Sequence, residues 1–490
     1  MPGELTAELD ILPCFLTVGG MAHAVDDGLP VGGPLLLAFL LGAGFDRRPA
    51  RHGLRQAFEV LIDARTVRVT RSLHTHLTHF SACDCMPRGL MVPDPPPGVT
   101  RRLTEIALGK TDAWDPSTHK GMTINRCVVH ELQASAFTVP TDAPESDGTL
   151  EWDSTTIVVA EARAADEAGL GYSYTSAAAA ALVSELLVDA VIGRDAMDVP
   201  GAWLAMTRAI RNLGRPGIAA SAIAAVDVAL WDLKARLLGL PLSDLIGRVR
   251  RSIPAYGSGG FTSSSDQQLH DELAGWAADG LRMVKMKVGR EPDVDPDRVA
   301  VARKAIGPGV QLFVDANGAY TRKQALRLAR EFADLGVVWF EEPVSSDDLA
   351  GLRVLRERAP AGMDIAAGEY GFDLFSFRRM LEAGAVDVLQ VDATRCGGIT
   401  GFLRAAALCE AAPVPLSAHT APTLHGHLCT CVGPAVHAEY FHDHARIEPR
   451  LFDGALAPSN GELVPDLDRP GLGLALRDEE AARYVVGSIS

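Results

Sequence analysis

The stretch MVKMKVGR, residues 283–290, decides the fold, because it places two lysines in an apolar run that ends in glycine. Lys285 and Lys287 are two residues apart, so in a strand both side chains point to the same face. Seven other short apolar runs share this form, each ending in or followed by polar residues, and most are separated by helix-patterned segments. The eight runs are IPAYGSGG (253–260), MVKMKVG (283–289), QLFVDANG (311–318), VVWFEEP (337–343), DIAAGE (364–369), VDVLQVDA (386–393), VPLSAHT (414–420) and AEYF (438–441).

This alternation predicts an α/β fold, a (β/α)8 TIM barrel over residues 252–450. Residues 122–251 read TINRCVVHELQA (123–134) and STTIVVAEARAADEAGLGYSYT (154–175), then helical patterns, which predicts a hairpin within an α+β capping domain. The acidic stretch PTDAPESDGTLEWD (140–153) is the predicted hairpin loop. Residues 451–490 are too many to end a barrel and are expected to return to the capping domain.

Composition limits the class of protein. The chain has 490 residues, a formal net charge of −16 and eight scattered cysteines. The negative charge argues against a nucleic-acid partner, and no segment has the length of apolar sequence that a membrane helix needs. The cysteines suggest no disulfide framework, so a cytoplasmic protein with reduced thiols is expected.

Residues 1–121 lack sustained periodicity and predict an irregular leader. Within it, the His and Cys residues of HTHLTHFSACDC (74–85) fit no structural zinc spacing.

Ionisable groups stand where the predicted barrel strands end, which is the catalytic face of such barrels. Because seven consecutive strands end this way, chance surface charge is a poor explanation. The residues, in strand order, are Lys285 and Lys287, Asp315 and Asn317, Glu341, Glu369, Asp392, His419 and Glu439.

The set predicts a metal-assisted reaction on a carbon acid. Asp315, Glu341 and Glu369 offer hard oxygen ligands, which suit Mg²⁺ better than zinc. The two lysines, close together near a metal, are expected to lower each other's pKa and make a neutral amine base reachable. Across the site, His419 is expected to pair with Asp392, which orients and tunes the imidazole.

With these motifs in place, the chain from about residue 122 onward resembles the enolase superfamily, and within it the mandelate racemase subgroup. The motifs are K-x-K at 285–287, D-x-N at 315–317, E-E-P at 341–343, G-E at 368–369, D-x-x-x-x-G-G at 392–398 and His419. A Lys or His base working with Mg²⁺ is that superfamily's pattern. The muconate-lactonizing subgroup would place a lysine where His419 and Asp392 stand, and the enolase subgroup would lack K-x-K.

The resemblance implies a modified, enolase-type barrel and a role for each residue. Asp315, Glu341 and Glu369 would bind Mg²⁺, Lys287 and His419 would be opposed acid/base groups, and Asp392 would support His419. Lys285 and Glu439 would stabilise an enediolate, and Asn317 would lie near the substrate carboxylate. A symmetric homo-oligomer is implied as well. Relatives in that family open with a strand like that at 123–134. Residues 1–121 are therefore interpreted as an extension that results from a start codon assigned too far upstream.

The expected activity is dehydration of an acid sugar to a 2-keto-3-deoxy acid. A racemase or epimerase acting on an α-hydroxy acid is the alternative, and a non-catalytic Mg²⁺-dependent binder is a remote one. The stretch 140–153 is acidic and has no basic residue. It is either a solvated turn or, if it closes over the site, a group that repels a second substrate carboxylate.

Overall fold

The protein is described here from a computed structural model, which covers residues 127–488. The predicted leader, 1–121, and the cluster at 74–85 lie outside these residues, and the predicted boundaries after residues 121, 251 and 450 stay predictions. None of the helices within 127–488 combines the length and the apolar character that a membrane span requires.

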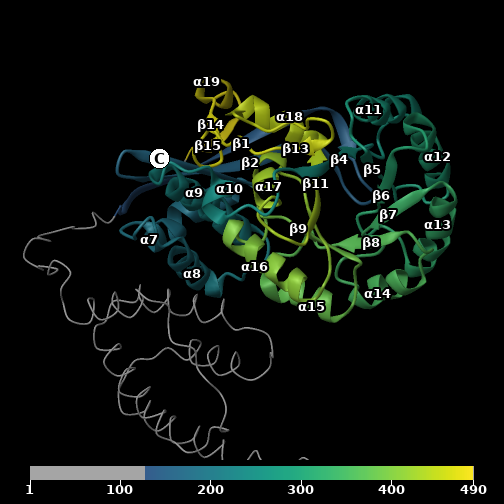
Figure 1. Ribbon diagram of the computed structural model, residues 1–490, viewed down its shortest axis with the longest axis horizontal. Helices are drawn as coiled ribbons and strands as arrows, with labels where there is room; N and C mark the ends of the chain where they lie inside the picture. Colours follow the sequence, from purple (N-terminus) through teal and green to yellow (C-terminus); the bar gives the residue numbers. More distant parts are fainter. Residues whose placement is uncertain (1–126, 489–490) are drawn as a thin grey trace, which may run out of the picture. The chain divides into compact units, whose positions relative to one another are not determined.

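Eight parallel strands form a closed barrel, as predicted (Figure 1). The strands pair in chain order, and the last, β11, closes the barrel by pairing with the first, β4. Each strand coincides with one of the apolar runs of the sequence. They are β4 (Ile253–Gly259), β5 (Met283–Lys287), β6 (Gln311–Asp315), β7 (Val337–Glu341), β8 (Asp364–Ala367), β9 (Val388–Val391), β10 (Leu416–Ala418) and β11 (Ala435–Phe441).

A helix follows every barrel strand, and several begin with a side-chain cap, such as the capping boxes of Ser265 and Thr321. The helices are α11 (Asp266–Ala278), α12 (Asp295–Ile306), α13 (Arg322–Asp334), α14 (Leu349–Arg358), α15 (Leu374–Glu382), α16 (Gly398–Ala411), α17 (Pro422–Leu428) and α18 (His442–Leu451). Their apolar faces pack on the outside of the barrel and form the main core. Inside the barrel, Tyr256, Phe313 and Trp339 fill the space beneath the strand ends.

The capping domain is a sheet covered by helices. Its strands are β1 (Val129–Ser146), β2 (Glu151–Ala164) and β3 (Glu167–Tyr174), and its helices are α6 (Ala178–Leu182), the π-helix η1 (Val183–Leu187), α7 (Val188–Val191), α8 (Val199–Ala209), the 3₁₀ helix η2 (Ile210–Asn212), α9 (Ile218–Leu237) and α10 (Leu242–Ile246). Alanine and valine line the buried side of α9, so it packs closely on the sheet.

The hairpin differs from the sequence prediction in two ways. The second predicted strand, 154–175, is two strands, which are joined by a turn where Ala165 has a φ of 52°. The predicted loop 140–153 is largely strand, because Glu145 pairs with Trp152 and Ser146 with Glu151. The turn therefore occupies only residues 147–150. The term cap hairpin is used below for β1, β2 and this turn.

The last part of the chain contributes short elements, which are β12 (Phe452–Asp453), β13 (Glu462–Leu463), β14 (Ala475–Leu476), α19 (Asp478–Ala481) and β15 (Val485–Ser488). β13 adds an antiparallel strand to β4 of the barrel. β15 pairs with β1, so the sheet of the capping domain has the order β15-β1-β2-β3 (Figure 1).

Candidate active site

The nine candidate residues lie together at the C-terminal end of the barrel. The strand register explains part of this arrangement, because Lys287, Asp315 and Glu341 are partners on the neighbouring strands β5, β6 and β7. Alternate residues of a barrel strand point inward, so these three side chains enter the barrel at one level. Lys285 lies one inward position deeper on β5.

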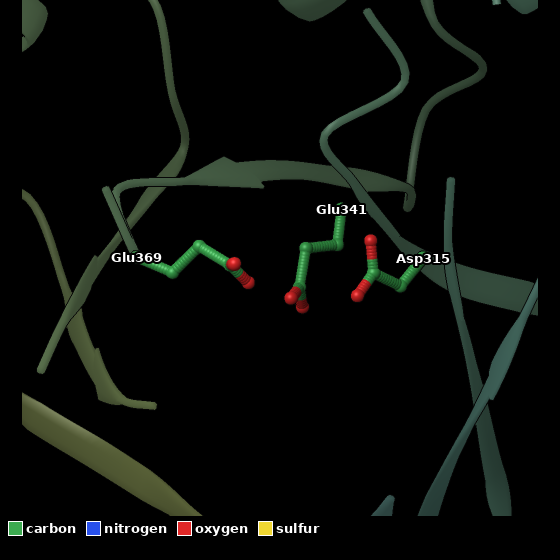
Figure 2. Close-up of side chains that lie close together, drawn as sticks. All are labelled: Asp315, Glu341 and Glu369. Carbon is green, nitrogen blue, oxygen red and sulfur yellow. The ribbon is translucent and has the colours of Figure 1, made fainter. Parts of the chain in front are cut away.

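Three carboxylates form a row at the centre of the site. Asp315 and Glu341 end their strands, and Glu369 follows β8 by two residues. One oxygen from each lies within 4.8 Å of the others, and all three side chains are buried. Figure 2 shows Glu341 between Asp315 and Glu369, with the carboxyl groups close together.

This row fits a divalent cation. Burial, followed by the negative charge of Asp315, raises the pKa of Glu341 to about 8. The neighbouring side chains therefore supply too little positive charge for the Glu341 carboxyl to ionise readily. Nearby, Oε1 of Glu342 and Oδ1 of Asn317 are buried oxygens without a hydrogen-bond donor among the described residues. Carboxylate and amide oxygens are ligands that Mg²⁺ accepts, usually together with water or substrate.

The two lysines contact the carboxylates directly. Nζ of Lys285 lies 2.7 Å from Oε1 of Glu341 and 2.8 Å from Oε1 of Glu439. Nζ of Lys287 lies 2.5 Å from Oδ2 of Asp315. All of these side chains are buried, so the ion pairs are strong and directional.

Without a bound cation, the net pKa shift of both lysines is upward, although the charge of Lys285 does lower the pKa of Lys287. Burial and the charge of Lys285 lower the pKa of Lys287, but the charge of Asp315 raises it, and the net shift is upward. The pKa of Lys285 is also raised, because Glu341 and Glu439 outweigh burial. A cation bound to the carboxylates would oppose these shifts, since it neutralises the charges that cause them.

His419 and Asp392 form the predicted pair. Nδ1 of His419 lies 2.8 Å from Oδ2 of Asp392, and Nε2 lies 3.2 Å from Oε2 of Glu369. Burial lowers the pKa of His419, but the charge of Glu369 and the bond to Asp392 raise it to a net value of about 9. The other oxygen of Asp392 accepts hydrogen bonds from the backbone N–H and hydroxyl of Thr394, both 2.7 Å long. The imidazole is therefore fixed in orientation and holds a proton at neutral pH.

The two remaining candidates complete the site. Oε2 of Glu439 accepts a hydrogen bond of 3.0 Å from the backbone N–H of Thr420, while its other oxygen contacts Lys285. The backbone N–H of Asn317 donates to Oδ1 of Asp315 over 2.9 Å. Asn317 and Thr420 both have a positive φ, which costs energy and is typical of functional loops.

Two site residues were missed by sequence reasoning. Arg395 lies in the loop after β9, where its Nη1 is 3.2 Å from Oε1 of Glu369 and its Nε is 3.5 Å from Oδ2 of Asp392. Its position within the D-x-x-x-x-G-G motif could have identified it as a candidate site residue from the sequence. Glu342 is the second acid of E-E-P, and burial together with the charge of Glu369 raises its pKa well above the usual value.

The cap hairpin closes over part of the barrel mouth. A Cβ atom on Gly148 would lie 2.6 Å from the carbonyl oxygen of Ala316 and 2.7 Å from that of Val288, so only glycine fits there. These two carbonyls belong to the residues that follow Asp315 and Lys287. Oγ of Ser146 also lies 2.6 Å from Oγ1 of Thr262, beyond the end of β4. The stretch is therefore solvated only in part, because Glu145, Ser146 and Asp147 are buried whereas Asp142, Glu151 and Asp153 are exposed.

Comparison with family models assigns the chain to a protein family. Residues 148–247 match the family model for the mandelate racemase/muconate lactonizing enzyme N-terminal domain. Residues 268–481 match the model described as the enolase C-terminal domain-like family. The chain belongs to the mandelate racemase/muconate lactonizing enzyme family of the enolase superfamily.

Individual relatives agree with this assignment. The chain is 33% identical to a 3,6-anhydro-alpha-L-galactonate cycloisomerase of Streptomyces coelicolor, over 74% of this chain and 100% of that protein. A solved mandelate racemase/muconate lactonizing enzyme-like protein from Rubrobacter xylanophilus is 55% identical, with a TM-score of 0.72, over 73% of this chain and 100% of that chain.

A third relative is an L-talarate/galactarate dehydratase of Salmonella typhimurium, solved with Mg and L-lyxarohydroxamate. It is 29% identical, with a TM-score of 0.69, over 75% of this chain and 95% of that chain. The relatives thus include both a dehydratase and a cycloisomerase.

Proposed function

We propose that this protein catalyses the Mg²⁺-dependent removal of the α-proton of a small carboxylate substrate through an enediolate. One observation supports this above the others. Two proton-transfer groups meet opposite ends of one row of carboxylates, because Lys287 contacts Asp315 and His419 contacts Glu369. A carbon acid bound at the row would lie between them.

Each residue then has a role that its contacts support. Asp315, Glu341 and Glu369 would hold the ion. When bound, Mg²⁺ supplies positive charge that stabilises the oxygens on which negative charge develops. Lys287 takes the α-proton on one face of the substrate, and His419, oriented by Asp392, transfers a proton on the other.

Two further residues support the charged intermediate. Lys285, which is held between Glu341 and Glu439, places an ammonium group one step deeper than Lys287. It would donate hydrogen bonds to the enediolate oxygens. Asn317 would lie beside the ion and the substrate carboxylate, because its N–H already donates to Asp315.

The overall reaction that we propose is dehydration of an acid sugar. After the α-proton leaves, His419 gives a proton to the β-hydroxyl, which departs as water, and the enol that forms becomes a 2-keto-3-deoxy acid. The contacts of His419 support this role, because Asp392 holds Nδ1 and leaves Nε2 facing the carboxylate row. The dehydratase among the relatives supports it as well.

An isomerase is the second candidate, since one relative is a cycloisomerase. In that case His419 would return a proton to carbon. Incubation of the protein with Mg²⁺ and a panel of acid sugars separates the two reactions. A 2-keto acid detected with semicarbazide identifies the dehydratase, whereas an isomer of unchanged mass identifies the isomerase. If neither product forms with any acid sugar, the proposal is wrong.

A further inference from the structure

His425 is a fully buried histidine that links the two loops next to the proton-transfer pair. It lies on α17, and its side chain has no exposed surface. The backbone N–H of Ala393 donates to its Nε2 over 3.0 Å, and its Nδ1 lies 2.6 Å from the carbonyl oxygen of Thr420. Ala393 directly follows Asp392 after β9. Thr420 directly follows His419 after β10. One imidazole therefore joins the residues beside both members of the pair.

The two partners fix the proton of this imidazole. A backbone N–H can only donate, so Nε2 is unprotonated, and a carbonyl oxygen can only accept, so Nδ1 carries the proton. Burial lowers the pKa of His425, which favours the same neutral form. The ring also packs against Phe402 of α16, with the ring centroids 5.5 Å apart. The imidazole is therefore neutral, fixed in orientation and bonded through both nitrogens.

The backbone pairing of β9 with β10 ends just below these loops. Val391 and Ala418 are partners in the sheet, and the N–H of His419 adds a bond of 3.1 Å to the carbonyl oxygen of Val391. Above that bond, the imidazole of His425 bridges the two chain segments. It thus continues the connection between the strands up to the level of the reacting groups.

The loop after β10 needs such support because its backbone is strained. Thr420 and Ala421 have φ values of 52° and 41°, which are unfavourable for residues other than glycine. The N–H of Thr420 donates to Glu439, and its carbonyl oxygen accepts from His425. The N–H of Ala421 donates to Nδ1 of His444 over 3.0 Å. Loss of the His425 contact would free the carbonyl group and let the strained segment relax.

We propose that His425 is a positioning residue, which holds Asp392 and His419 in the geometry that proton transfer by His419 requires. This inference rests on the proposed function and adds to it a residue that acts through its neighbours. Lys287 and the carboxylate row belong to β5, β6, β7 and the end of β8, which His425 does not connect. Loss of His425 should therefore impair the step that His419 carries out and spare removal of the α-proton by Lys287.

Two variants each remove one of the two hydrogen bonds. The amide of His425→Asn reaches as far as Nδ1 and keeps a donor for Thr420. The amide of His425→Gln reaches as far as Nε2 and keeps an acceptor for Ala393. His427→Gln is the matched control, because His427 is equally buried on the same helix. Within residues 127–488, its ring nitrogens make no hydrogen bond to either loop.

The full-length proteins are compared with Mg²⁺ and an acid sugar that the wild type turns over. Solvent deuterium at the α-carbon reports removal of the α-proton, and product formation reports the later step at His419. Both His425 variants should form product at least about tenfold more slowly, whereas α-exchange and Mg²⁺ affinity should change by less than about twofold. His427→Gln should keep the wild-type ratio of product to exchange.

Wild-type product formation by either folded His425 variant overturns the inference. Equal losses of exchange, Mg²⁺ affinity and product overturn it too, because they show a general structural role, and so does an equal shift in His427→Gln.

If the wild type shows no Mg²⁺-dependent exchange with any acid sugar, the proposed function has failed, and crystal structures of the same variants decide whether His425 positions the pair. The distance from Nδ1 of His419 to Oδ2 of Asp392 should then exceed about 3.5 Å in both His425 variants. It should stay at 2.8 Å in His427→Gln. An unchanged distance in the His425 variants would overturn the inference.

Discussion

Nδ1 of His419 lies 2.8 Å from Oδ2 of Asp392, and both side chains are buried at the ends of neighbouring strands. The negative charge of Asp392 and its fixed orientation define which imidazole nitrogen faces the carboxylate row. Proton transfer on this side of the site therefore depends on a residue that need not touch the substrate.

Replacing Asp392 with asparagine should lower kcat by at least about 100-fold, because the imidazole loses the anion that orients and charges it. Mg²⁺ affinity should change little, since Asp392 is not in the carboxylate row. Steady-state kinetics and calorimetric Mg²⁺ titration check both points. Asp387→Asn is the control, because Asp387 lies just before the same strand at the opposite end of the barrel, where it pairs with Arg356. Equal losses in both variants would contradict this role.

The Glu341→Gln variant should separate metal binding from folding. Burial and the charge of Asp315 raise the pKa of Glu341, so its neutral form is favoured without a cation, and glutamine keeps an oxygen that accepts the hydrogen bond from Lys285. The free energy of unfolding without Mg²⁺ should change by less than about 1 kcal/mol. At 100 times the Kd, Mg²⁺ should stabilise the wild type by about 2.7 kcal/mol and the variant far less. Chemical denaturation with Mg²⁺ or EDTA measures this, and equal stabilisation of both proteins would refute it.

Asp227 should make stability depend on pH. It joins α9 to α16 by accepting hydrogen bonds from the N–H and hydroxyl of Thr400, 2.8 and 2.7 Å long. Burial raises its pKa from 3.8 to about 7 despite these bonds. The folded protein therefore keeps a proton that the unfolded chain releases, and the free energy of unfolding falls as pH rises from 4 to 7.

The contribution of Asp227 is at most about 4 kcal/mol. Asp227→Asn cannot lose that proton, so its stability relative to the wild type should increase with pH across this range. Urea unfolding at several pH values measures the difference. Parallel stability curves for the two proteins would show that Asp227 does not titrate in this way.

The Gly148→Ala variant should displace the cap hairpin. Its Cβ would meet the carbonyl oxygens of Ala316 and Val288 at 2.6 and 2.7 Å, which the backbone must relieve at a cost of roughly 1–3 kcal/mol. The kcat/KM should fall because the mouth no longer closes beside Lys287. Gly309→Ala is the control, since a Cβ at that position meets no atom within 4 Å. An unchanged kcat/KM in Gly148→Ala would show that closure is not needed.

The barrel and its carboxyl-end residues could be predicted because both depend on short-range features. Each strand is a local apolar run, and parallel strands bring their ends to one face whatever lies between them. Lys287, Asp315 and Glu341 were found in this way, and the structure adds that they share one register.

What could not be predicted depends on contacts between distant segments. The upward pKa shift of Lys287 is caused by its 2.5 Å contact with Asp315. No sequence pattern predicts that contact. The acidic stretch at 140–153 contains prolines and acids that disfavour strands. It nevertheless extends the hairpin, because Ser146 and Gly148 dock on the barrel.

The central claim is that Lys287 and His419 act on one bound carbon acid from opposite sides. The most direct measurement follows solvent deuterium at the α-carbon of an acid-sugar substrate by NMR, with Mg²⁺, in the wild type, Lys287→Gln and His419→Asn. The account predicts exchange or turnover in the wild type, loss of both when Mg²⁺ is removed, and loss of α-proton removal in Lys287→Gln. It also predicts that His419→Asn keeps α-exchange but no longer forms product. Full turnover by Lys287→Gln, or turnover without a divalent cation, would contradict it.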